Sequence, residues 1–212
     1  MPATAAAPPL KIPEFALYGE ATRGRDAEAV HIELIETRSR KYDWHIDTHT
    51  HAGLFQVLFL LKGRVRANID GDLWACDGPV ALTIHPSLAH GFDFSEEAQG
   101  YVLTVDQHML FAAAGHEGDL FSSLFVHPLA IGLHAAPDAL ARIETLLQNL
   151  LLEAAWPRHG HTLMLEWLAR STLLLLVRVQ AERRIADTSG RGDFELFSRF
   201  RVEVERHYKE QW

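Results

Sequence analysis

The stretch HTHAGLFQVLFLLKG, residues 49–63, is the most informative part of this sequence. On an extended strand His49 and His51 point to the same face, because side chains alternate with a period of two. A second stretch, HPSLAHGF at residues 85–92, adds His90 after a proline turn. Side chains from distant strands can converge inside a small β-barrel. The sequence therefore predicts that the three histidines share a metal site or a polar patch of a ligand pocket.

Composition describes an ordinary globular chain of 212 residues, 48% apolar and 23% charged, with a net charge of −8. This charge gives no overall attraction to nucleic acid. The single cysteine, Cys76, allows no internal disulfide and is typical of a reducing compartment. Residues 1–13 lack the features of a signal peptide, and the longest apolar run, Leu173 to Val177, is too short to span a bilayer. We expect a soluble cytoplasmic protein without a membrane segment.

Short β-strands are expected across residues 30–105. The continuous apolar run from Leu54 to Leu61 is typical of a strand buried on both faces. Asp70-Gly71 predicts a tight hairpin, and further turn residues follow at short intervals. This spacing favours a barrel or jelly roll over alternating strands and helices.

Helices are expected after Asp106, which can cap a short helix that ends near Ala113. Pro137 opens a longer helix, and a second runs from about Thr162 to Arg184. The second helix is apolar almost all round, so it must be covered by the barrel or by another copy of the chain, and we favour dimerisation. Residues 193–212 predict a final amphipathic helix.

The two histidine stretches resemble the two motifs of the cupin superfamily, with Gln56 standing where cupin metalloenzymes carry glutamate. A cupin followed by helices and a segment such as Phe197 to Trp212 is similar to AraC-type transcriptional regulators. The resemblance implies a mainly β fold with α-helices: an N-terminal cupin (jelly-roll) barrel that binds an effector, then an antiparallel helical dimerisation region. It also implies that promoter DNA is bound by a C-terminal domain that this chain does not contain.

The resemblance divides the chain into four parts. These are an N-terminal arm (1–29), a cupin effector-binding barrel (30–136), a helical dimerisation region (137–186) and the first helix of a truncated helix-turn-helix domain (193–212). Within the family, Trp44-His45-Ile46 and the two histidine stretches resemble the branch that responds to hydroxybenzoates such as 4-hydroxybenzoate. The implied partners are a small aromatic acid effector and a second copy of the chain.

Three interpretations of His49, His51 and His90 remain open. They can hold a divalent metal such as Zn or Fe, form hydrogen bonds to an effector, or satisfy one another as a buried polar cluster. Gln56 favours the effector, because an amide is a poorer metal ligand than a carboxylate but suits a phenol or an acid. We therefore expect a metal-free sensor that is not an enzyme. The alternative is a metal-dependent cupin enzyme, dioxygenase-like, that uses the three histidines.

An acidic effector needs a cation in its pocket, and arginine matches a carboxylate with two parallel bonds. Arg38 is the first choice among the arginines near the predicted strands. The effector's ring is expected to pack on Leu58 and Phe92, with Trp44 as a cap. The arm, from Leu10 to Tyr18, is expected to order over the pocket mouth.

Overall fold

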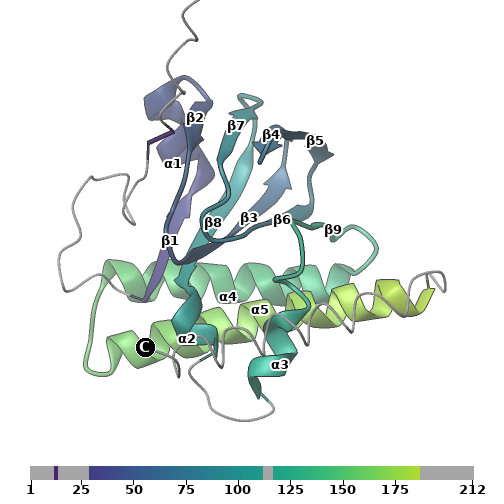
Figure 1. The fold of residues 1–212 in the computed structure, drawn as a ribbon. Helices are drawn as coiled ribbons and strands as arrows, with labels where there is room; N and C mark the ends of the chain where they lie inside the picture. Colours follow the sequence, from purple (N-terminus) through teal and green to yellow (C-terminus); the bar gives the residue numbers. More distant parts are fainter. Residues whose placement is uncertain (1–11, 14–28, 112–116, 187–212) are drawn as a thin grey trace, which may run out of the picture.

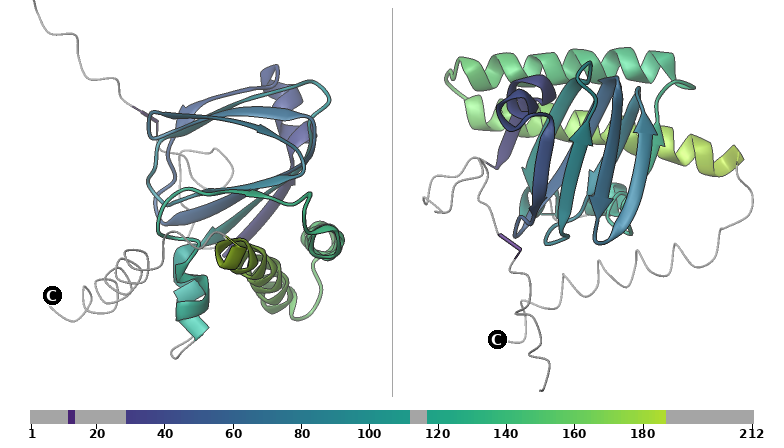
Figure 2. Two further views of the ribbon diagram at one scale, coloured as in Figure 1. Left: turned by 90° about the vertical axis from the view of Figure 1, so that its right-hand side faces the viewer. Right: turned by 90° about the horizontal axis from the view of Figure 1, so that it is seen from above.

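The structure, a computed structural model, describes residues 12–13, 29–111 and 117–186. Within these residues, nine strands form two antiparallel sheets that face each other (Figure 2). The larger sheet has the order β1-β8-β3-β6-β9 and the smaller has the order β2-β7-β4-β5. The strands of the larger sheet are β1 (Val30–Leu34), β3 (Leu54–Lys62), β6 (Val80–Ile84), β8 (Gln99–Asp106) and β9 (Ala130–Gly132). Those of the smaller sheet are β2 (His45–His49), β4 (Arg64–Ile69), β5 (Asp72–Asp77) and β7 (His90–Phe94).

A helical hairpin forms the third layer, on the outer side of the larger sheet (Figure 1). It consists of α4 (Pro137–Ala155) and α5 (His161–Ala186), which confirms the two long helices expected from the sequence. The shorter helices are α1 (Ile35–Ser39), η1 (Arg40–Tyr42), α2 (Gln107–Phe111) and α3 (Glu117–Ser122). Asp106 caps α2 as expected, because its Oδ1 accepts the backbone N–H of His108 at 2.8 Å.

The central strand β3 is buried on both faces, as its continuous apolar run predicts. Phe55, Val57 and Phe59 pack in the core that the sheet shares with α4 and α5. Leu58 and Leu60 point the other way, into the core between the two sheets. All five side chains are 0% exposed, so β3 joins the two cores of the molecule.

Two glycine positions fix the sheet geometry. The Asp70-Gly71 turn between β4 and β5 has positive φ angles of 53° and 92°, which confirms the predicted hairpin turn. At Gly100, in β8, an added Cβ would lie 1.9 Å from the carbonyl oxygen of Phe59. Any larger residue there would push β8 away from β3.

Some elements differ from expectation. The first strand ends at Leu34, and the chain turns directly into α1, because Ile35 is buried in the core between the sheets. The sequence does not predict α1 or the short elements α3 and β9, because three to six residues carry too little periodicity to detect.

The prediction of β-structure followed by helices is confirmed, and the structure shows that both sheets are antiparallel. Within the described ranges neither sheet closes on itself, so the jelly-roll barrel stays a prediction. The expected helix at 193–212 and most of the arm at 1–29 lie outside the described residues. None of the helices that the structure describes is long and apolar enough to cross a membrane.

Candidate functional site

Three histidines from two strands and one loop meet between the sheets. His49 ends β2, His51 follows it in the loop, and His90 begins β7 opposite His49. One ring nitrogen of each lies within 4.8 Å of the others. The ring centroids are 4.9 Å apart for His49 and His51, 4.4 Å for His49 and His90, and 5.4 Å for His51 and His90. All three are buried, so the cluster is a preformed feature of the fold.

A local irregularity in β2 aims these rings. The register of β2 against β7 shifts between Ile46 and His49. Gly91 lies at this point, and an added Cβ there would be 3.0 Å from the carbonyl oxygen of Ile46. The glycine therefore lets β2 approach β7 closely, and a shift of this kind commonly re-aims a side chain next to a site.

Backbone carbonyls orient two of the imidazoles. His49 Nδ1 donates to the carbonyl of Asp47 at 2.7 Å, and His90 Nδ1 donates to the carbonyl of Leu88 at 2.9 Å. A carbonyl only accepts, so in each neutral ring Nε2 carries the lone pair. His90 Nε2 is buried and has no hydrogen-bond partner among the described residues. This nitrogen can accept a hydrogen bond from a donor or ligate a cation.

Burial keeps these rings neutral. It lowers the pKa of His90 to about 3, and the neighbouring His49 and His51 add to the effect. Burial also lowers the pKa of His49, with a further contribution from the charge of Arg38. His49 and His90 therefore offer lone pairs rather than positive charge at neutral pH.

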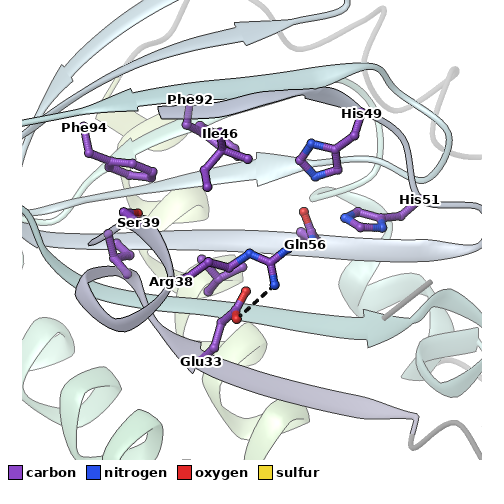
Figure 3. Close-up of a pocket in the computed structure, with 11 residues that line it drawn as sticks. Glu33, Arg38, Ser39, Ile46, His49, His51, Gln56, Phe92 and Phe94 are labelled. Carbon is purple, nitrogen blue, oxygen red and sulfur yellow. Dashed lines mark hydrogen bonds and ion pairs between the residues drawn. The ribbon is translucent and has the colours of Figure 1, made fainter. Parts of the chain in front are cut away.

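A cavity between the sheets opens beside the histidines (Figure 3). It has a volume of about 40 Å³, which is room for a few water molecules. Its lining combines a polar end with an apolar wall. The lining residues are Glu33, Ile35, Arg38, Ser39, Ile46, His49, His51, Gln56, Phe92, Phe94 and Val102.

Gln56 presents an acceptor to this cavity. Its Nε2 donates to Thr104 Oγ1, on the neighbouring strand β8, at 3.0 Å. This bond orients the amide and leaves Oε1 as the group for a ligand. A neutral amide oxygen can accept from a hydroxyl or complete a metal site weakly.

Arg38 extends from α1 into the cavity, toward Gln56 (Figure 3). Its Nη1 donates to Glu33 Oε2 at 3.3 Å, and each of the two side chains is 24% exposed. Burial acts to raise the pKa of Glu33, but the hydrogen bond from His31 and the charge of Arg38 lower it overall. No sequence pattern marks Glu33 as a site residue, because a single acid on a short strand is usually a solvated residue.

The structure places the remaining candidates in several environments. Phe92 lines the cavity, whereas Leu58 and Trp44 pack in the core between the sheets. The guanidinium carbon of Arg40 lies 6.0 Å from the centre of the Trp44 ring. Thr50, between two of the histidines, donates its backbone N–H to the carbonyl of Pro13 at 3.0 Å. The other arm residues expected over the mouth lie outside the described ranges.

Two further histidines stand apart from the cluster. His45 is exposed on β2 and pairs with Asp93 at 2.5 Å and with Asp47 at 3.2 Å. His85 is buried, and its Nε2 lies 3.1 Å from the carbonyl of Leu124. Both contacts hold structure together outside the cavity.

No protein-family model matches the sequence, and no curated protein matches it significantly. Solved structures similar to it include a protein described as a predicted oxalate decarboxylase from Thermotoga maritima, with a TM-score of 0.26 and 12% identity over 36% of this chain and 77% of that one. Another is the apo form of a ToxT variant from Vibrio cholerae, with a TM-score of 0.40 and 8% identity over 87% of this chain and 67% of that one. Both TM-scores are low, so the functional argument below depends on this chain's own residues.

Proposed function

We propose that this chain is the effector-binding and dimerisation part of an AraC-type transcriptional regulator, with a small aromatic acid of the hydroxybenzoate kind as its effector. The observation that carries the proposal is the cavity, which sets Arg38 and the imidazoles of His49 and His51 beside an apolar wall. Arg38 suits a carboxylate, Phe92 suits a ring, and Gln56 suits a hydroxyl donor, whereas His90 lies behind His49 and does not line the cavity. Such a lining can bind and orient a small molecule without catalysing a reaction on it.

The size of the cavity suggests how binding produces a signal. A volume of about 40 Å³ is too small for an aromatic ring, so the effector must displace part of the lining. The segment that carries Arg38 is a short helix, and it is followed by two residues with positive φ, Asp43 at 50° and Trp44 at 63°. Such strained positions cluster at ligand clamps and switch regions. The effector then shifts a conformational equilibrium by binding the opened form better.

The helical hairpin supplies a surface for a second copy. Large apolar side chains are exposed where α4 ends and α5 begins, and Trp156 and Trp167 are 63% and 58% exposed. Leu152, Leu163 and Met164 extend this patch. An isologous dimer would cover it, and a C-terminal domain outside this chain would then bind paired DNA half-sites.

A metal-dependent cupin enzyme is the second candidate, and the buried Nε2 of His90 favours it. Three neutral imidazoles with nitrogens within 4.8 Å of one another suit Zn or Fe, so the donor set fits such an ion. The ion would supply Lewis-acid or dioxygen chemistry. His49 and His90 would hold it through Nε2, with their Nδ1 bonds to backbone carbonyls fixing the rings.

One pair of measurements separates the two functions. Elemental analysis of the purified protein is combined with a thermal-shift screen of hydroxybenzoates and related acids. If the chain is a regulator, we expect no stoichiometric metal and a higher melting temperature with one acid, because a ligand that binds the native state stabilises that state. The enzyme would be favoured over the regulator if the wild type holds stoichiometric metal and shows no response to acids. In that case His49→Gln should lose the metal and the control His45→Gln should keep it.

A further inference from the structure

Glu33 places a carboxylate in the wall of the same cavity that the proposed effector, also a carboxylate, would enter. It lies on β1 and lines the cavity together with Arg38, five residues later on α1. The bond between them joins Arg38 Nη1 to Glu33 Oε2 at 3.3 Å, and His31 Nε2 lies 3.9 Å from the same oxygen. The carboxylate is therefore held between two cationic or polar neighbours at the cavity wall.

Glu33 and Arg38 balance each other's charge in the cavity lining. Apart from the imidazoles, Glu33 and Arg38 are the ionisable groups among the described lining residues, and their charges cancel. His49 contributes no charge at neutral pH, because burial lowers its pKa. A carboxylate that reached Arg38 would lie within a few ångströms of Glu33, and two like charges at that distance repel each other strongly in a partly buried site.

We infer that Glu33 determines the selectivity of the cavity: it fixes the Arg38 guanidinium and opposes carboxylates that contact Arg38 alone. This inference rests on the proposed function of the same site. One N–H of the guanidinium is used by Glu33, so others remain for a ligand. Small acids that touch only Arg38 gain one ion pair and suffer the repulsion. An acid that also donates a hydrogen bond to Gln56, at the other end of the polar lining, gains enough to bind.

The test compares a carboxylate that can only contact Arg38 with one that can span the cavity. Formate and 4-hydroxybenzoate are titrated into the wild type, Glu33→Gln and the double variant Glu33→Gln with Arg38→Gln, and chloride keeps the ionic strength constant. Glu33→Gln should strengthen formate binding on the order of tenfold, since it removes a nearby like charge. The double variant should lose this gain. The ratio of the two affinities should therefore shift toward formate in Glu33→Gln.

Equal formate affinity in the wild type and Glu33→Gln would overturn the inference, and so would a gain that persists in the double variant. Glu33→Asp provides a second variant that keeps the charge but shortens the side chain. Its formate affinity should lie between those of the wild type and Glu33→Gln. The proposed function is judged separately, by the response of the wild type to hydroxybenzoates. A gain in formate affinity in Glu33→Gln, with no response of the wild type to hydroxybenzoates, would support the role of Glu33 and rule out an aromatic effector.

Discussion

Acid should destabilise the metal-free protein through the histidine cluster, and His90 dominates this effect. Burial lowers the pKa of His90 to about 3 in the folded state, whereas an unfolded histidine titrates near its ordinary value of about 6.5. Between these values the unfolded chain binds more protons than the native one. Stability is therefore fully present above about pH 6.5 and is lost as the pH falls toward 3.

The size of the effect follows from this difference. Each pKa unit corresponds to about 1.36 kcal/mol, so the full difference is worth roughly 5 kcal/mol, and lowering the pH from 7 to 5 removes about 2 kcal/mol. His49 adds to the loss in the same direction, because its pKa is also lowered. The free energy of unfolding should therefore fall steeply in mildly acidic solution.

Urea unfolding at several pH values, with a chelator present, measures this dependence. The matched variant is His90→Asn, whose side-chain amide can still donate to the carbonyl of Leu88 as Nδ1 does. The variant should lose about 2 kcal/mol less than the wild type between pH 7 and 5. Parallel pH profiles for the two proteins would refute the claim that His90 is held neutral by burial.

Three further substitutions test the fold and the assembly. Gly100→Ala should destabilise the protein by about 3 kcal/mol or more in urea unfolding, because its Cβ would lie 1.9 Å from the carbonyl oxygen of Phe59. Thr83→Val should cost about 1–3 kcal/mol by calorimetry, because Thr83 Oγ1 accepts the buried N–H of Leu129 at 2.9 Å. Trp167→Glu should weaken self-association on the order of tenfold or more in analytical ultracentrifugation, because this exposed ring belongs to the apolar patch of the hairpin.

Two control variants sharpen these tests. Gly53→Ala has a positive φ of 71° but open space around the added Cβ, so it should cost far less than the change at Gly100. Leu73→Lys removes an 85% exposed apolar side chain from β5, away from the hairpin, and should leave self-association unchanged. Equal losses at the two glycines, or equal loss of association at the two surfaces, would contradict the structural reasoning.

Patterns with a clear physical signature were predictable from the sequence. The apolar run in β3 indicated burial on both faces, the Asp70-Gly71 pair indicated the hairpin, and Pro137 marked the start of α4. The period of two predicted that His49 and His51 share one side; in the structure the two rings do lie close together, but His51 lies in the loop after β2. Each of these features is decided by residues close together in the chain.

Features that depend on tertiary contacts could not be predicted. The pairing of Glu33 with Arg38 requires the chain to turn from β1 straight into α1, and no local pattern indicates that turn. The lowered pKa of His90 depends on burial between two sheets. Leu58 and Gln56 point to the same face of β3, but only Gln56 lines the cavity, whereas Leu58 packs in the core between the sheets. The direction of a side chain alone does not predict whether it lines a cavity or fills the core.

The two-sided burial of β3 also constrains how this protein can evolve. Alternate residues face different tasks: Gln56 and Leu58 face the smaller sheet, whereas Val57 and Phe59 pack toward the helices. Substitutions at Gln56 can therefore alter ligand preference while the layer beneath the helices stays intact. Insertion or deletion of a single residue in β3 would exchange the two sets, so new specificities in this fold are expected to arise by replacement and not by change of length.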